Sequence, residues 1–355
     1  MIALTGYTVF QYLQNRGIVN REEFVAGNLV MIDNPFPSSR NANFIVRRTD
    51  GKNLFLKQTR RITDVMDRRK ELLFYELVEK PHLGLEKHCL KAVMPIDTRN
   101  QVLILDHSDQ TFTFEALIAC TPAPLRGTRL RNPTRQIGQM LAYLRQKLRA
   151  ETACDSIYLH RFGTFTPWLL TLREQDVLEI EKANNRYLSA FGRFVQQHRG
   201  LLQGLLRNWQ FTHLINTDVC WRNILTSGNT PDQDSPYFLI DWEFASVGDP
   251  DWEMASLAAE YLVARFTTAD TLDVPALASG QYWALIPVLL ESVVGKIDPL
   301  DPTCWKVMQL LGVILLQHYY RWAVEGAQSK LVDFPKVYAY AQRCLTETES
   351  VLREF

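Results

Sequence analysis

The spacing of apolar residues changes from a strand pattern to a helical pattern near Phe114, and no other feature constrains the fold as much. Before this point, short alternating or continuous apolar runs predict strands around one long helix at residues 63–80. The predicted strands lie at residues 28–33, 43–48, 53–58, 90–96 and 101–105. The first third of the chain therefore predicts a small unit that mixes strands with one helix.

Beyond Phe114, apolar residues recur at helical spacing through most of the chain. The predicted helices lie at residues 134–148, 174–198, 254–266, 282–294, 305–325 and 335–353. Two strand-like runs, Asn223 to Thr226 and Tyr237 to Ile240, interrupt this pattern. We therefore expect an α+β protein with a small β-rich lobe, residues 1–106, and a larger, mainly helical lobe, residues 107–355.

Charge is balanced over the whole chain but uneven along it. The 39 basic and 39 acidic side chains cancel, which argues against holding nucleic acid through overall positive charge. Residues 1–150 carry 23 basic and 14 acidic side chains, a net of +9, whereas residues 230–303 carry 2 and 13, a net of −11. The hydrophobic fraction of 46% excludes wholesale disorder.

Neither the cysteines nor the termini carry a targeting or metal signal. The 6 cysteines are too far apart for the short spacings of zinc or redox motifs, so we expect buried thiols. The N-terminus lacks the basic and apolar blocks of a signal peptide, and no run approaches the ~20 apolar residues of a membrane span. These features predict a cytoplasmic protein without membrane or nucleic-acid partners, and they leave the oligomeric state open.

Three segments carry chemistry suited to phosphoryl transfer. Asp218 and Asn223 stand five residues apart on a predicted loop, where a carboxylate can accept a proton from a hydroxyl and an amide oxygen can ligate a hard cation. Asp241 follows an apolar strand in the run Phe-Leu-Ile-Asp-Trp-Glu, so its carboxylate can hold magnesium against phosphates. Gly248-Asp249-Pro250 then opens a helix.

Together, Asp218-x4-Asn223, Ile240-Asp241-Trp242-Glu243 and Gly248-Asp249-Pro250 resemble the aminoglycoside phosphotransferase and choline kinase-like family. The resemblance implies a protein kinase-like two-lobe fold and an enzyme that transfers a phosphoryl group from ATP or GTP, with Mg²⁺, to an alcohol group of a small molecule. It implies that Asp218 is the catalytic base and that Asn223 and Asp241 are the magnesium ligands. It also implies that Asp249 supports the catalytic loop.

The sequence departs from this family at three places. Asn216 and Thr217 stand where the family usually has His-Gly, and Glu253 stands where it usually has Asp. The loop that should cover the phosphates has no glycine. These departures leave two alternatives open: a degenerate kinase-like protein that binds a nucleotide or a partner without turnover, and a protein kinase or nucleotidyl transferase on the same fold.

The small lobe offers a lysine for the nucleotide phosphates. Lys57 interrupts the alternating run Leu54 to Gln58, so it lies either on an exposed edge or in a cleft. The resemblance implies that the phosphate-contacting lysine belongs to this third strand and pairs with a glutamate of the next helix. Glu71 is the first candidate and Glu76 the second, and a solvated helix face is the alternative for both.

Residues 35–46 occupy the place of the phosphate-covering loop. Asn41-x-x-Phe44-x-Val46 is similar to the end of that loop in the family. Ser38, Ser39 and Arg40, together with Asn41, can offer hydroxyl, guanidinium and amide donors to a nucleotide in place of glycine amides. An ordinary polar hairpin is the alternative.

The acidic stretch 230–303 bears on the acceptor. The resemblance implies that the helices after Gly-Asp-Pro help to form the acceptor pocket, and an acidic wall there favours a cationic, amine-bearing molecule. Trp252, Tyr261, Trp283 and Trp322 could add aromatic faces, although aromatic residues at helical spacing usually pack in cores. The expected partners are a nucleoside triphosphate and a small-molecule acceptor.

Overall fold

The computed structural model describes residues 3–33, 41–49, 51–59, 65–108, 111–122, 125–149, 160–227, 235–266, 280–325 and 333–355. These residues form two compact units. The first contains the described residues up to Thr113 and those of 223–245, and the second contains those of 114–222 and 246–355. The hairpin segment 223–245, which the sequence division assigns to the larger lobe, thus belongs by its contacts to the first unit.

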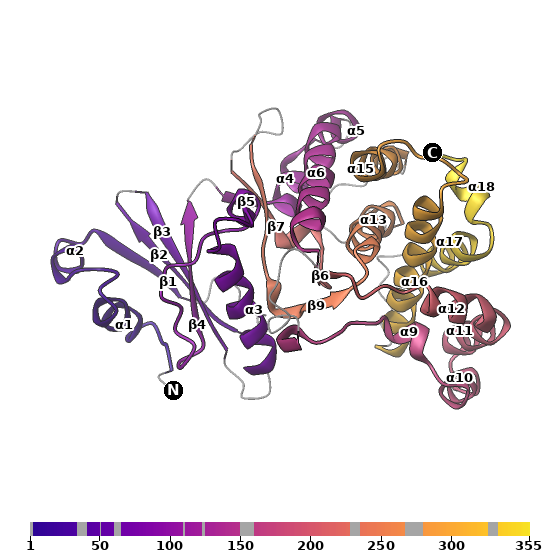
Figure 1. Ribbon diagram of the computed structural model, residues 1–355, viewed down its shortest axis with the longest axis horizontal. Coiled ribbons are helices and arrows are strands. Elements are labelled where there is room, and N and C mark those ends of the chain that lie inside the picture. Colours follow the sequence, from indigo (N-terminus) through magenta and orange to yellow (C-terminus); the bar gives the residue numbers. More distant parts are fainter. Residues whose placement is uncertain are drawn as a thin grey trace. The chain divides into compact units, whose positions relative to one another are not determined.

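A four-stranded antiparallel sheet forms the core of the first unit (Figure 1). Its strands, in spatial order, are β1 (Leu29–Asp33), β2 (Asn41–Arg48), β3 (Lys52–Thr59) and β4 (Val102–Ser108). Leu54 and Leu56 of β3 pack into a hydrophobic core with α1 (Val9–Asn15). Because side chains alternate along a strand, Lys57 lies on the opposite face of the sheet from Leu56.

The helices of the first unit are α1, α2 (Arg21–Val25), α3 (Val65–Val78) and the short 3₁₀ turns η2 (Leu85–Lys87) and η5 (Trp242–Phe244). Gly17 follows α1 with a φ of 67°, which glycine adopts without a steric cost. The helix predicted at residues 63–80 is confirmed as α3. The first residues of that prediction, 63 and 64, lie outside the described residues.

The strand predicted at residues 90–96 is wrong. The segment makes two isolated bridges, Ala92 with Leu105 and Asp97 with Val102, and the Val93 amide donates to the Ile104 carbonyl at 2.8 Å. Pro95 has no amide hydrogen, so it cannot continue a hydrogen-bonded ladder. The sheet therefore has four strands instead of the five expected.

A second antiparallel sheet in the first unit joins residues that are far apart in sequence. Its strands are β5 (Thr111–Thr113), β7 (Ile224–Ser227) and β8 (Tyr237–Leu239), in that order. The two strand-like runs expected near residues 223 and 237 are confirmed as β7 and β8. The short strand β5 was not predicted, since three residues carry too little alternation to stand out.

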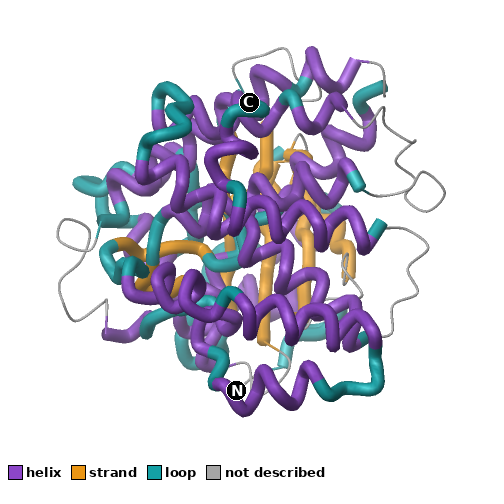
Figure 2. The backbone as a smooth tube through the Cα atoms, turned by 90° about the vertical axis from the view of Figure 1, so that its right-hand side faces the viewer, coloured by secondary structure: helices purple, strands orange, loops and turns teal. Residues whose placement is uncertain are grey.

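The second unit is mainly helical, as expected for the later part of the chain (Figure 2). Its helices are α4 (Phe114–Cys120), α5 (Arg126–Arg129), α6 (Arg131–Lys147), α9 (Trp168–Thr171), α10 (Glu174–Glu181), α11 (Arg186–Gln197), α12 (Arg199–Arg207), α13 (Asp251–Arg265), α14 (Gly280–Trp283), α15 (Leu285–Val294), α16 (Pro302–Val324), α17 (Phe334–Thr346) and α18 (Thr348–Leu352). Strands β6 (His213–Asn216) and β9 (Ala245–Gly248) pair beside them.

Three of the predicted helices are broken into shorter ones. The helix expected at residues 174–198 ends after α10 and restarts at Asn185, whose side chain accepts hydrogen bonds from the amides of Tyr187 and Leu188 and so caps α11. The helices expected at 282–294 and 335–353 are likewise divided. Apolar spacing continues across such breaks, which is why periodicity alone missed them.

Close helix packing holds the second unit together. A Cβ atom at Gly138 of α6 would lie 1.6 Å from the Ser292 hydroxyl of α15, and one at Gly312 of α16 would lie 2.9 Å from the Ala341 carbonyl of α17. Glycine therefore permits both contacts. None of the helices within the described ranges is long and apolar enough to cross a membrane.

Candidate functional site

Lys57 lies within a group of carboxylates in the first unit. Its Nζ is 3.0 Å from Glu71 Oε2 and 3.3 Å from Glu243 Oε2, and it also forms an ion pair with Asp241. Lys57, Glu71 and Glu243 are buried, whereas the Asp241 side chain is 29% exposed. The structure thus brings the first of the two candidate glutamates to Lys57, and Glu76 lies half-buried further along α3.

An aromatic stack positions the two carboxylates of the Asp-Trp-Glu turn. Trp242 is fully buried, and its indole ring stacks on Phe74 with the ring centroids 3.6 Å apart and the planes at 8°. Its indole N–H donates to the Leu239 carbonyl at 3.0 Å. Phe74 lies one helical turn after Glu71, on the same face of α3. The stack therefore brings Asp241 and Glu243 to the part of α3 that carries Glu71.

Asp241 has an unusual backbone conformation. Its φ of 62° and ψ of 58° lie in the left-handed region, which a residue other than glycine adopts at a cost of about 1 kcal/mol or more. Aspartate tolerates this region better than most residues. Such conformations are concentrated at functional sites, where the surrounding packing holds them in place. Here the Trp242 stack supplies that packing.

The donor atoms of this cluster suit a hard divalent cation. One carboxylate oxygen from each of Glu71, Asp241 and Glu243 lies within 4.8 Å of the others. Three carboxylates share one lysine here, and a divalent cation among their oxygens would offset their negative charge. Mg²⁺ and Ca²⁺ take oxygen ligands of this kind. We conclude that these residues fit a magnesium site.

Glu243 was missed as a site residue by the sequence reasoning. It follows Asp241 by two positions and brackets the buried Trp242, and this arrangement of two acids around a large apolar residue is the signal that could have found it. Asn41, which was expected at the nucleotide, donates its side-chain amide to Glu243 Oε2 at 3.1 Å. The remaining loop candidates, Ser38, Ser39 and Arg40, lie outside the described residues.

Asn223 belongs to the same unit and connects two of its strands through its backbone. Its carbonyl oxygen accepts the Ile240 amide at 2.9 Å, which joins the start of β7 to the end of β8 one residue before Asp241. The residue is buried, with 4% exposure. A role of its side chain in metal binding stays a prediction.

In the second unit, a chain of hydrogen bonds holds the segment that carries Asp218. The Asp218 amide donates to Asn216 Oδ1 at 2.9 Å, and the Asn216 amide donates to Glu253 Oε1 at 2.7 Å. The Asp218 carboxylate itself is 37% exposed and lies 3.4 Å from Arg222 Nη2. Asn216, which replaces the usual His, thus fixes the backbone of the expected base while leaving its carboxylate accessible.

Glu253 carries the support that was expected from Asp249. It lies in the first turn of α13, and burial raises its pKa to about 8, an effect that the Asn216 amide and the Arg145 charge oppose. The hydrogen bonds of Asp249 go instead to the amides of Gln210 and Asp251, at 3.0 and 3.2 Å. Asp249 therefore ties the start of α13 to the segment that precedes β6.

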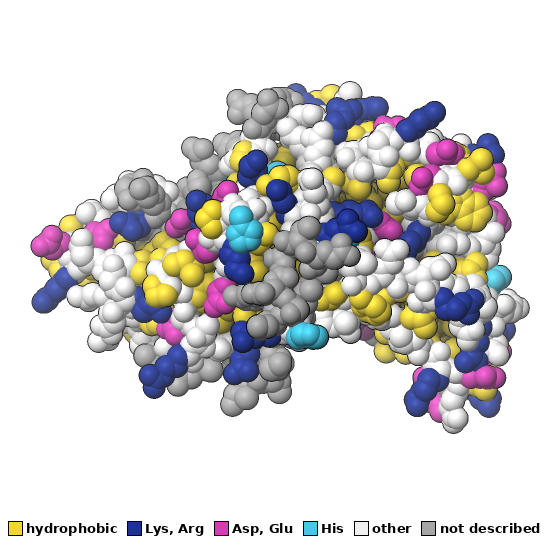
Figure 3. Space-filling view, viewed as in Figure 1, with side chains coloured by type: hydrophobic (Ala, Val, Ile, Leu, Met, Phe, Trp, Pro, Cys, Tyr) yellow, Lys and Arg dark blue, Asp and Glu magenta, His cyan; other side chains and the backbone are white. Residues whose placement is uncertain are grey.

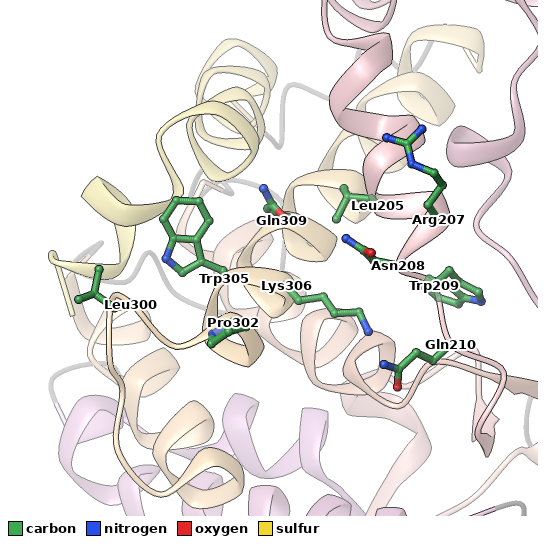
Figure 4. A pocket seen from close by; sticks show the side chains of 10 residues that line it. All are labelled: Leu205, Arg207, Asn208, Trp209, Gln210, Leu300, Pro302, Trp305, Lys306 and Gln309. Atoms are coloured by element: carbon green, nitrogen blue, oxygen red, sulfur yellow. The ribbon is translucent and has the colours of Figure 1, made fainter.

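Asp249 and Asp251 form a balanced ion-pair network with two cations. Lys306 of α16 pairs with Asp249 and lies 3.4 Å from Asp251, and Arg145 of α6 lies 2.8 Å from Asp251. A cavity of about 680 Å³ opens beside this network, and Figure 4 shows Lys306 extending from α16 toward Gln210 at its wall. Of the two basic residues that line the cavity, Arg207 and Lys306, Lys306 is already paired with two carboxylates.

Aromatic residues near Asp218 form a compact cluster. The ring of Trp221 lies 5.1 Å from that of Tyr261 and 5.6 Å from that of Tyr282. The Trp221 amide lies 3.4 Å from Glu260 Oε2. Burial is the main reason why the pKa of Glu260 is raised to about 7; the Trp221 amide and the charge of Arg222 oppose this effect, and the carboxylates of Glu115 and Asp218 add to it.

The four aromatic residues named from the sequence do not gather in one pocket. Trp252 packs with Trp209 and Phe165, Trp283 with Tyr340 and Phe355, and Trp322 with His318 and Phe334. Only Tyr261 joins the cluster near Asp218, within the residues that the structure describes. Trp252, Trp283 and Trp322 instead pack in separate contacts, as aromatic residues at helical spacing usually do.

Comparison with solved structures decides the fold. The choline kinase of Cryptosporidium parvum is similar with a TM-score of 0.56, 12% identity, and coverage of 98% of this chain and 97% of that one. Spectinomycin phosphotransferase, solved with ADP and spectinomycin, gives 0.52 and 10%, with full coverage of both chains. Amicoumacin kinase, solved with AMP-PNP and Ca²⁺, gives 0.51 and 10%, with 95% and 96% covered.

The chain has the protein kinase-like fold. The expected fold class and the expected resemblance are thereby confirmed. No profile of a known family matches the sequence, and no curated protein matches it either. At identities of 10–12%, only three-dimensional structure carries the relationship. Within the kinase-like fold, the Lys57 cluster belongs to the first unit and the Asp218 segment to the second.

Proposed function

We propose that this chain is a cytoplasmic phosphotransferase that transfers the γ-phosphoryl group of ATP or GTP, with Mg²⁺, to a hydroxyl group of a small molecule. The grouping of three carboxylate oxygens within 4.8 Å of one another beside Lys57 carries the proposal, because oxygen ligands of this kind suit Mg²⁺. The kinase-like fold supports it, as do the ADP in spectinomycin phosphotransferase and the AMP-PNP and Ca²⁺ in amicoumacin kinase.

The first unit would hold the phosphates and the metal. Glu71 restrains the Lys57 ammonium group, which can then pair with phosphate oxygens. Asp241, Glu243 and Asn223 are the proposed metal ligands. Asn41, with Ser38, Ser39 and Arg40, is proposed to line the nucleotide. Bound magnesium would neutralise charge on the phosphate oxygens during transfer.

The second unit would supply the base. The Asp218 carboxylate is accessible and its backbone is fixed by Asn216, so it can orient an acceptor hydroxyl and take its proton. The hydroxyl oxygen forms the new bond to the γ-phosphorus as the bond to the β,γ-bridging oxygen breaks. The nucleoside diphosphate leaves with that electron pair.

The acceptor is proposed to carry an amine. Trp221, Tyr261 and Tyr282 provide aromatic faces, which attract cations, and Glu260 provides a carboxylate beside them. A cation bound here would stabilise the ionised form of Glu260 and so lower its pKa from about 7.

Replacement of the base tests the proposal. Asp218→Asn should lower the rate of phosphoryl transfer to hydroxylated amines by at least about 100-fold, since the amide cannot accept the proton. Asp176→Asn, the same change at a half-buried aspartate of α10 that pairs with Arg173, should leave the rate unchanged. The mass of the product distinguishes a transferred phosphoryl group from a nucleotidyl group. Full activity of Asp218→Asn would remove Asp218 from this role.

The alternative of a nucleotide-binding protein without turnover rests on the glycine-free loop and on Asn216-Thr217 in place of His-Gly. Thermal unfolding with ATP, in the presence and absence of Mg²⁺, separates the two proposals. Metal-dependent stabilisation together with product formation supports the enzyme. Stabilisation with no product from any acceptor supports the binding protein.

A further inference from the structure

Arg126, at the start of α5 in the second unit, is a buried cation without a counter-charge among the described residues. It is 1% exposed, and its Nε donates to the Thr121 carbonyl at 2.7 Å. Its two terminal nitrogens, Nη1 and Nη2, have no hydrogen-bond acceptor in the part of the chain that the structure describes. A guanidinium group stays charged at physiological pH, so burying one in this way is costly.

Arg126 belongs to residues 116–150, which carry seven basic side chains and no acidic one, and not all of these basic side chains lie in solvent. Arg145 of the same stretch pairs with Asp251 inside the unit, and Arg126 lies deeper still. On the face shown in Figure 3, Lys and Arg side chains are scattered among uncharged ones instead of forming one continuous patch. The positive charge of residues 116–150 is in part internal, where it can act on a ligand.

Arg126 adjoins the aromatic cluster next to Asp218. Burial raises the pKa of Tyr282, whereas the charge of Arg126 and the interaction of its side chain with the Tyr282 hydroxyl lower it. Tyr282 in turn packs against Trp221, whose indole N–H is a second buried donor without an acceptor among the described residues. Two unsatisfied donors thus flank one tyrosine.

The opposite charge is present on the other side of Trp221. Glu260 lies at the Trp221 amide, and its carboxylate is close enough to Asp218 for the two charges to interact. The same aromatic cluster therefore contacts two donors that suit an anion, Arg126 and Trp221 Nε1, and one carboxylate that suits a cation, Glu260. A ligand with both charges would satisfy each of these groups.

We propose that the acceptor is zwitterionic: a hydroxyl-bearing amino acid whose carboxylate binds Arg126 and Trp221 Nε1 and whose amine lies toward Glu260. The inference rests on the proposed function, because it names the acceptor of the same site. A carboxylate fits better than a spherical anion, since the planar guanidinium fork binds its two oxygens together.

Matched pairs of acceptors that differ only in the carboxylate test the inference. L-Serine is compared with ethanolamine, and L-homoserine with 3-amino-1-propanol, by ATP-dependent turnover and by thermal stabilisation of the full chain. The amino acid of a pair should be favoured about 10- to 100-fold in kcat/KM, the range expected for a charge-assisted bidentate contact. Equal use of both members, or preference for the amino alcohols, would overturn the inference.

Variants of Arg126 test whether this residue causes the preference for acceptors with a carboxylate. Arg126→Lys keeps the charge but loses the planar fork, and Arg126→Gln loses both. The preference for the carboxylate should therefore decrease in the Lys variant and decrease further in the Gln variant, and the KM of the amino acid should rise accordingly. Arg129→Gln, on the exposed side of the same helix, should change neither. If the Gln variant does not fold, the inference is tested by comparing the acceptor preference of the Lys variant with that of the wild type.

The two proposals can fail separately. Stabilisation by L-homoserine but not by 3-amino-1-propanol, lost in Arg126→Lys and without any phosphorylated product, would support the carboxylate site and contradict the kinase. Turnover of the amino alcohols with no effect of the carboxylate would support the kinase and contradict the site. Absence of both binding and turnover for the amino acids contradicts the Arg126 inference.

Discussion

Each unit of the protein contains a lysine among carboxylates, yet the two clusters differ in the groups that surround the lysine. In the first unit, Lys57 faces Glu71, Asp241 and Glu243, and one carboxylate oxygen of each lies within 4.8 Å of the others. In the second, Lys306 and Arg145 face Asp249 and Asp251, two charges against two. The first arrangement groups oxygen donors that suit a cation, whereas the second pairs each carboxylate with a basic side chain.

This difference separates the proposed ligand site from an ion-pair network built of the same residue types. Asp241 sits in a left-handed conformation at the end of a strand, with its carboxylate partly exposed. Asp249 has no exposed surface, and its oxygens are used by two backbone amides and by Lys306. Local charge balance and hydrogen-bond satisfaction thus tell the two aspartates apart, although both stand in motifs of the same family resemblance.

Breaking the balanced network should have the largest effect on stability. Asp249→Ala leaves Lys306 short of a partner and two amides without an acceptor, so the free energy of unfolding should fall by about 3–5 kcal/mol. Urea denaturation at pH 7 measures this. Asp249→Asn keeps an acceptor for the amides and should lose less. A stable Asp249→Ala protein with weakened Mg²⁺ binding would instead make this network a ligand site.

The pH dependence of stability should change in Glu253→Gln. Burial raises the pKa of Glu253 to about 8, so between its ordinary value of 4.5 and this value the folded chain keeps a proton that the unfolded chain releases. Its contribution is therefore fully present below pH 4.5 and is lost as pH rises to about 8, by up to about 1.4 kcal/mol for each pH unit.

Glutamine keeps the acceptor for the Asn216 amide but does not titrate. Denaturation curves of the two proteins should therefore agree near pH 4.5 and diverge toward pH 8, where the variant is the more stable. Parallel curves over the whole range would show that Glu253 does not hold a proton in the folded state.

Removing the carboxylate charge of Glu243 should have the smallest effect on stability, and this effect should depend on Mg²⁺. Mg²⁺ should raise the melting temperature of the wild type, and Glu243→Gln should reduce this stabilisation by about 1.4 kcal/mol, equivalent to tenfold weaker binding. Without Mg²⁺, the variant should be at least as stable as the wild type, because a buried surplus charge is gone. Asp176→Asn serves as the control. Equal responses of all three proteins would contradict a cation site.

The sequence could predict the elements that carry the site but not all of its contacts. Lys57 was identifiable because it interrupts an alternating strand, whereas Glu71 and Glu76 both occupy a helix with many charges. Only the packing of Phe74 on Trp242 shows which turn of α3 faces the cluster. Glu253 could not be assigned to Asn216 from sequence, since the contact joins residues 37 positions apart. The burial of Arg126 could not be predicted, because burial of a single basic residue leaves no periodic signal in the sequence.

The Lys57 cluster also has a consequence for the order in which the protein is made. Lys57 and Asp241 are 184 positions apart, and β7, β8 and the Asp-Trp-Glu turn complete a unit that begins at the N-terminus. At ribosomal rates of about 5–20 residues per second, roughly 10–40 s separate the synthesis of these two residues. During that interval Glu71 is the only one of the three carboxylates yet synthesised. The Lys57 cluster can therefore assemble only after nearly 250 residues have been translated.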